Sequence, residues 1–176
     1  MERMLTLGLS FYWFIFWLFN GLDKYLPGTN LGLFTWGGKD RTNQFAGYLD
    51  KIDWSQDAFT YLMFMLFVIE IIIALAFLRA IVTILRLKDY GKYLPHETMK
   101  LPILLSILCF TGFSLWDVIV GDRAELWEHG TYIVALGTTW IIASFETLLD
   151  VVPRKQYDGP ERRSGEIADR RQPDLS

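Results

Sequence analysis

Four apolar blocks separated by polar segments dominate the chain. Residues 5–22 and 101–116 contain no charged residue, residues 58–78 contain only Glu70, and residues 130–149 contain only Glu146. An α-helix rises about 1.5 Å per residue, so about 20 residues cross a hydrocarbon core of about 30 Å. Because backbone groups in lipid must hydrogen-bond to one another, such blocks span as helices. The pattern predicts an all-α integral membrane four-helix bundle with helices at about 5–22, 58–85, 101–120 and 130–149.

The segment between the first two blocks is predicted to lie outside the membrane but against its surface. Apolar residues recur in residues 27–57, and we expect Leu31, Leu33, Phe34 and Trp36 to enter the interface. Residues 40–42 could cap a short amphipathic helix that lies on the membrane surface. Its apolar residues would be Phe45, Tyr48, Leu49 and Ile52.

The end of the chain changes abruptly in composition. Residues 1–152 form the predicted transmembrane domain, whereas residues 153–176 are rich in charge, Gly and Pro. Such a charged tail cannot bury enough apolar surface to fold alone, so we expect it to be disordered unless a partner binds it.

Lysine and arginine counts predict the orientation. With the N-terminus inside, twelve of these residues fall in the inside segments and five in the outside ones. The positive-inside rule then places both termini in the cytoplasm, in a bacterial-type inner membrane. A net charge of −3 indicates no particular partner, and no nucleic-acid motif is present. The expected partners are membrane lipids and other membrane subunits.

The sequence offers little for metal or thiol chemistry. Cys109 is the one cysteine, so no CxxC pair or internal disulfide exists. His96 and His129 fall on opposite sides of the predicted membrane and cannot share a metal ion. We therefore expect no metal site, no intrinsic cofactor and no catalytic residue set.

Three carboxylates within the apolar blocks are the sharpest candidates for a site. Glu70 falls near the middle of its block, and no basic residue is predicted at that depth, so we expect it to be neutral. Asp117 is predicted near the outer end of its helix and Glu146 near the inner end. They could form a proton or quinone-linked path, or serve structure alone. Asp23 and Lys24 are predicted to form an interfacial pair that could reach Asp117.

The first helix is unusually rich in rings. Phe11, Trp13, Phe14 and Trp17, together with Trp36, cannot all pack inside a small bundle. We expect this aromatic surface to face lipid or another subunit, where it could also hold a bound lipid, quinone or pigment.

Three short motifs resemble the DoxX-like family of small four-helix membrane proteins. They are Asn20-Gly21-Leu22-Asp23-Lys24, the single glutamate in Val68-Ile69-Glu70-Ile71-Ile72, and His129-Gly130-Thr131-Tyr132. The resemblance covers about residues 5–150. It implies a four-helix bundle and, by analogy with some relatives, association with quinone-linked or thiol-linked oxidoreductase complexes.

Three functions follow as hypotheses. The first is a non-catalytic accessory subunit of a larger membrane complex that is redox-linked, either respiratory or photosynthetic. The second is a quinone-reactive oxidoreductase component with Glu70 and Asp117 near the quinone head. The third is a proton-coupled channel or transporter that uses the three carboxylates.

Overall fold

The fold is built from helices, four of them long. The computed structural model describes residues 3–55, 57–86 and 95–157. Within these ranges the helices are α1 (Met4–Leu22), α2 (Thr42–Lys51), α3 (Asp57–Arg86), α4 (Pro95–Val120) and α5 (Arg123–Tyr157). All but α2 are long and apolar enough to cross a membrane. The predicted all-α class with four candidate spans is confirmed.

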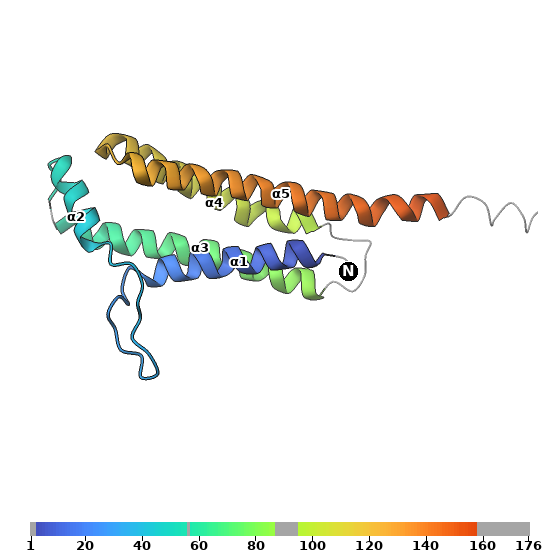
Figure 1. Ribbon diagram of the computed structural model, residues 1–176, viewed down its shortest axis with the longest axis horizontal. Coiled ribbons are helices and arrows are strands. Elements are labelled where there is room, and N and C mark those ends of the chain that lie inside the picture. The colour runs from blue at the N-terminus through green and yellow to red at the C-terminus, as the bar shows by residue number, and fades with distance from the viewer. Residues whose placement is uncertain (1–2, 56, 87–94, 158–176) are drawn as a thin grey trace, which may run out of the picture.

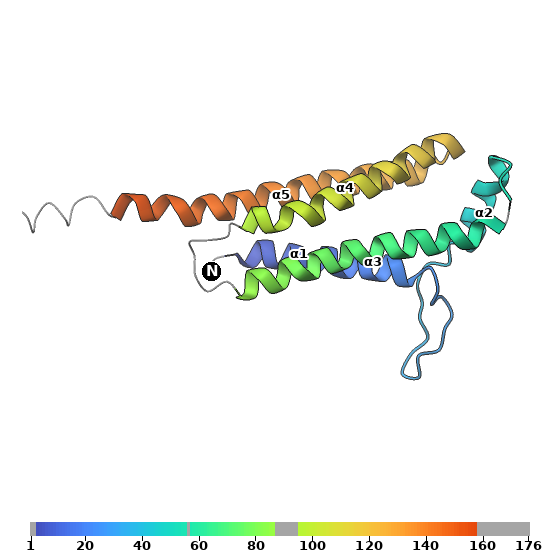
Figure 2. The same cartoon turned by 180° about the vertical axis from the view of Figure 1, so that it is seen from behind.

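The long helices run along a common axis as two antiparallel pairs. Helix α1 packs chiefly against α3, and α4 packs against α5, while α3 and α4 join the pairs. Figures 1 and 2 show α2 lying across the end where α3 begins and α4 meets α5. We call this the α2 end. The start of α1 and the last turns of α5 lie at the other end, which we call the N-terminal end.

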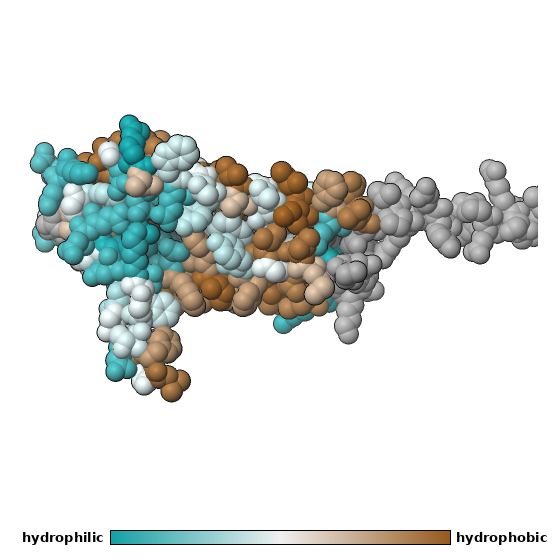
Figure 3. Space-filling view, in the orientation of Figure 1, coloured by the Kyte–Doolittle hydropathy of each residue, from teal (hydrophilic) through white to brown (hydrophobic). Residues whose placement is uncertain are grey.

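The outer surface of the bundle is apolar. Only 22–33% of the most hydrophobic window of each long helix is buried within the protein. Large side chains such as Tyr61, Leu75, Leu108 and Val134 are at least half exposed. Figure 3 shows hydrophobic residues along the length of the bundle and hydrophilic ones gathered at the α2 end. A soluble bundle would bury these side chains, so the surface fits a lipid environment.

The core corrects part of the predicted aromatic surface. Trp13 and Trp17 are only 1% exposed and pack with Phe77 and Phe110 at the centre of the bundle. The two indoles are four residues apart and therefore share one face of α1. Among the rings predicted to face outward, Phe11 is exposed and Phe14 is partly buried.

Two helices begin earlier than their apolar blocks. Helix α4 starts at Pro95, and Pro102 lies inside it. Helix α5 starts at Arg123 because Asp122 caps it, with Oδ1 accepting hydrogen bonds from the backbone N–H of Ala124 and of Glu125 at 3.1 Å each. The apolar blocks located the spans but not these polar first turns, which extend the helices beyond them.

The predicted tail is partly helical. Helix α5 continues to Tyr157, past Pro153, where we expected the tail to begin. Residues 158–176, on which the prediction of disorder mainly rests, lie outside the described residues.

A narrow hairpin, residues 26–38, connects α1 to α2, and we call it the finger. Its two arms are joined by hydrogen bonds from Gly28 N to Trp36 O and from Trp36 N to Thr29 O, each 2.9 Å long. At its tip, Gly32 adopts a φ of 88°, which a residue with a side chain rarely does. The finger leaves the bundle sideways at the α2 end (Figures 1 and 2).

Candidate functional site

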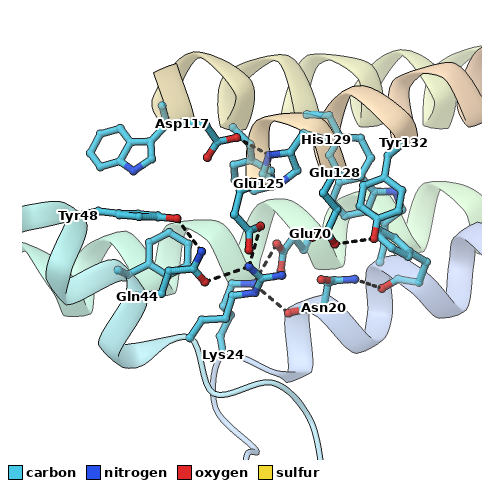
Figure 4. Close-up of a pocket in the computed structure, with 17 residues that line it drawn as sticks. Asn20, Lys24, Gln44, Tyr48, Glu70, Asp117, Glu125, Glu128, His129 and Tyr132 are labelled. Carbon is cyan, nitrogen blue, oxygen red and sulfur yellow. Dashed lines mark hydrogen bonds and ion pairs between the residues drawn. The ribbon is translucent and has the colours of Figure 1, made fainter. Parts of the chain in front are cut away.

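Helix α1 is shorter than its neighbours at the α2 end, and this leaves a recess there. A Cβ added to Gly21, near the end of α1, would lie 3.6 Å from Glu70 Cβ and 3.1 Å from Ile71 Cδ1. Glu70 is therefore level with the end of α1, although about 20 Å of α3 precedes it. The side chains of α2, α4 and α5 close the recess from the opposite side (Figure 4).

An ion pair between Lys24 and Glu70 forms the floor of the recess. Lys24 Nζ lies 3.0 Å from Glu70 Oε1 and 2.9 Å from Oε2, and the two side chains are 4% and 3% exposed. Lys24 Nζ also donates to Asn20 O at 3.0 Å, which places its charge against the C-terminal turn of α1.

This pair overturns one prediction and the premise of another. A basic group does lie at the depth of Glu70, because the long Lys24 side chain runs back along α1 instead of outward. The premise on which we expected Glu70 to be neutral is therefore wrong. Asp23 does not pair with Lys24 either: its Oδ1 accepts from Trp36 Nε1 at 2.6 Å and its Oδ2 from Lys39 N at 3.3 Å.

Basic residues just before α2 join it to α5. Arg41 Nη1 lies 3.1 Å from Glu125 Oε2, and Lys39 Nζ lies 3.2 Å from Glu125 Oε1. Arg41 Nη1 also donates to Gln44 Oε1 at 3.2 Å. Glu125 is 8% exposed, so its charge is compensated mainly by the segment that leads into α2.

A second link runs from α2 to the turn before α5. The Tyr48 hydroxyl donates to Asp122 Oδ2 at 2.6 Å and accepts from Gln44 Nε2 at 2.6 Å. Burial, followed by the hydrogen bond to Asp122, raises the pKa of Tyr48 well above its usual range. That same hydrogen bond is the largest cause that lowers the pKa of Asp122. Lys51 Nζ adds a 2.9 Å hydrogen bond to Val120 O, so α2 is fastened to both α4 and α5.

Asp117 and His129 form a third polar contact, between α4 and α5. His129 Nδ1 lies 2.6 Å from Asp117 Oδ2, and Asp117 is 3% exposed. The His129 ring also packs on Phe110 and Phe113, with centroids 5.7 and 5.2 Å apart. The sequence predicted that the Asp23–Lys24 pair could reach Asp117, whereas in the structure the partner of Asp117 is His129.

These contacts surround a cavity of about 80 Å³. That volume exceeds what one water molecule needs. Its lining carries four carboxylates against two basic side chains. The charged and polar lining residues are Asn20, Lys24, Arg41, Gln44, Tyr48, Glu70, Asp117, Glu125, Glu128, His129 and Tyr132.

The two indoles that line the cavity have unsatisfied N–H groups. Trp17 Nε1 and Trp116 Nε1 are buried, and neither has a hydrogen-bond partner in the described part of the chain. Trp13, equally buried but outside the cavity lining, donates to Thr139 Oγ1 at 3.0 Å. Buried donors are nearly always paired, so these two N–H groups are exceptions among the buried donors of the described residues.

An apolar groove adjoins the cavity. It lies between α3 and α4 with a volume of about 860 Å³, and Leu62, Ile69 and Leu108 are among the side chains that line it. Phe45, Phe113 and Trp116 line both hollows. Three aromatic side chains thus border both the polar cavity and the apolar groove.

The third predicted carboxylate lies elsewhere. Glu146 Oε1 accepts from Leu5 N at 3.1 Å, and Oε2 accepts from Thr6 N at 2.9 Å and from Thr6 Oγ1. It therefore caps the start of α1 at the N-terminal end. Glu146 is about 31 Å along α5 from Glu125, so the structure does not bring it to the cavity.

The two histidines also lie at opposite ends of the bundle. His96 Nδ1 is 3.4 Å from Thr147 Oγ1 near the N-terminal end, far along the bundle from His129. Within the described ranges, no group of three His, Cys, Asp or Glu side chains could hold a metal ion. Cys109 lies half-buried on α4, where it lines the apolar groove.

Comparison of the chain with protein-family models, with curated proteins and with solved structures finds no match. The resemblance to the DoxX-like family stays a prediction.

Proposed function

We propose that this protein is a non-catalytic binding subunit of a larger, redox-linked membrane complex, and that its cavity takes the head of a prenylquinone. In this proposal both termini face the cytoplasm of a bacterial-type cell and the α2 end faces outward. The DoxX-like resemblance gives the same expectation of a quinone-linked complex.

The observation that carries the proposal is the pair of unpartnered indole N–H groups. Trp17 and Trp116 offer two buried donors, and a quinone offers two carbonyl acceptors. Aromatic side chains of the lining, among them Phe110 and Tyr132, suit a flat ring. The adjoining groove offers a place for the isoprenoid chain, because its lining is almost wholly apolar.

The charge of the lining favours an uncharged head. Lys24 and Arg41 are each held by a carboxylate, Glu70 and Glu125 respectively. The remaining carboxylates make the lining acidic, so a phosphate head would be repelled. Asp117 orients His129 through Nδ1, so that Nε2 can contact a bound head.

Electron transfer would need a partner, and this supports the assignment as a subunit. The described residues supply hydrogen bonds and charges, and the proposal gives them the roles of binding and orienting the quinone. The redox partner would belong to another chain. The finger and the apolar outer surface offer contact area for such a complex.

Binding can be tested with conservative tryptophan variants. The protein would be purified in mild detergent and titrated with a short-chain ubiquinone analogue, with native quinone content measured by mass spectrometry. Trp17→Phe and Trp116→Phe each remove one donor while keeping a ring. A hydrogen bond contributes about 1 kcal/mol, so each should weaken affinity about fivefold.

Trp13→Phe is the matched control. It also removes a buried indole N–H from α1, but that N–H bonds to Thr139 and not to the cavity. It should leave the quinone affinity unchanged. Equal affinity in all the variants, or no saturable binding to the wild-type protein, would contradict the proposal.

Co-purification tests the subunit assignment separately. The wild-type protein, isolated from its native membrane, should migrate as a multi-subunit assembly that contains a redox protein. A pure small oligomer that retains quinone would favour the alternative, an oxidoreductase component that acts by itself.

A further inference from the structure

The finger has a composition unlike that of the rest of the α2 end. Residues 25–38 contain no charged residue, whereas charged residues flank them on both sides. At its tip, Leu33 is 97% exposed, Phe34 55% and Leu31 45%. Figure 3 shows this tip as a hydrophobic spot beyond the hydrophilic surface of the α2 end.

The root of the finger is fixed to the bundle. Trp36 Nε1 donates to the Asp23 carboxylate, and the Trp36 ring lies 5.3 Å from that of Phe19 on α1. Gly38 packs so closely here that an added Cβ would overlap both the Asp23 carboxylate and the Trp36 indole. The tip is therefore held at a defined height relative to the helices.

The direction of the finger selects its partner. The four long helices define the membrane normal, and the finger leaves them sideways, level with the end of α1 (Figures 1 and 2). From Thr29 to Leu33 it reaches about 13 Å at the rise of a strand. A lateral projection at this level runs along the membrane interface and does not reach into bulk water.

We propose that the finger is a lateral anchor. It inserts Leu31, Leu33 and Phe34 into the outer leaflet, among the first acyl-chain methylene groups below the headgroups. The membrane interface accommodates apolar side chains when the backbone that carries them is already hydrogen-bonded. The finger has exposed apolar side chains at its tip and hydrogen bonds between its two arms. Its lack of charge makes zwitterionic lipid sufficient. The anchor would hold the mouth of the cavity level with the headgroups. This inference does not depend on which ligand the cavity binds.

Site-specific quenching tests the anchor. Leu33→Cys, in a Cys109→Ala background, would carry an environment-sensitive fluorophore in phosphatidylcholine vesicles. The substituted side chain is almost fully exposed, so the fold should be unaffected, which monodisperse elution would verify. Lipids brominated near the glycerol should quench this probe several-fold more than one at Asn43→Cys, an exposed position on α2. Added anionic lipid should change little.

Two results would overturn the anchor. One is equal access of aqueous iodide to the probes at positions 33 and 43. The other is shielding of the position-33 probe from iodide that occurs only when pyrene-labelled copies form excimers, or only when another subunit is present. In both cases the tip would contact a protein partner and not lipid.

Discussion

The two ends of the bundle are fastened by different means. At the N-terminal end, Glu146 of α5 binds the first backbone N–H groups of α1, where a helix leaves its donors unpaired. At the α2 end, ion pairs and hydrogen bonds from the end of α1 and from α2, α3, α4 and α5 meet around a cavity. At the N-terminal end a carboxylate accepts hydrogen bonds from backbone N–H groups. At the α2 end most of the contacts join one side chain to another.

This difference separates structure from candidate function. The cap at the N-terminal end is complete, because the described Glu146 carboxylate has a donor for each oxygen. The α2 end is more heavily charged, yet within the described residues it leaves Trp17 Nε1 and Trp116 Nε1 without acceptors. An end that needed only stability would bury fewer charges, since buried ion pairs contribute little net stability.

Removing Lys24 should have the largest effect. Lys24→Met leaves Glu70 buried without its cation, which typically costs about 3–5 kcal/mol. The free energy of unfolding in detergent should fall accordingly, and the loss should be measurable by thermal or denaturant unfolding. Glu70→Gln should also destabilise the protein, because it leaves the ammonium group buried.

A double variant distinguishes charge from packing. Lys24→Met combined with Glu70→Gln removes both charges, so much of the loss should be recovered. If the double variant is as unstable as the two single losses added together, the pair is not coupled and the recess is held by packing alone.

The sequence predicted only part of the α2 end, because hydropathy does not show at which level each helix ends relative to the others. The apolar blocks located four spans, and the existence of a short helix at Thr42–Lys51 was confirmed because its apolar spacing is helical. The Lys24–Glu70 pair was missed because depth was counted from the start of an apolar block. That count assumes that all helices end at the same level, whereas α1 ends beside Glu70.

The ion pairs of Arg41 and Glu125 were missed for a related reason. Arg41 was taken as part of a helix cap, and Glu125 falls in the gap between the predicted helices at 101–120 and 130–149. Opposite charges in the two outer segments were the available signal. Many pairings between those segments were equally compatible with the sequence, and only the tertiary structure selects one.

The cap at the N-terminal end should give a smaller effect. Glu146→Ala removes the acceptors of two backbone N–H groups and of the Thr6 hydroxyl, and a lost cap costs about 1–2 kcal/mol. Amide hydrogen exchange should accelerate at Leu5 and Thr6. Glu146→Gln, which keeps one oxygen acceptor, should accelerate it less.

That loss should remain local. Quinone binding and the protection of amides at the α2 end should be unchanged in Glu146→Ala. A change at the cavity would show that the two ends are coupled along α5, contrary to the separation drawn here.

The smallest expected effect concerns the hydrogen bond between Tyr48 and Asp122. Tyr48→Phe should lower the free energy of unfolding by about 1 kcal/mol at pH 7, after allowance for the partial exposure of Asp122. The bond lowers the pKa of Asp122 in the folded protein, so its contribution is present above the unfolded pKa of about 4 and is lost as the pH falls further. The raised pKa of Tyr48 means that the contribution is also lost above about pH 10. Unfolding measured across this range should therefore show a plateau in the difference between the wild-type protein and Tyr48→Phe. A difference that persists unchanged at pH 2.5 would mean that Tyr48 stabilises α2 by packing and not through Asp122.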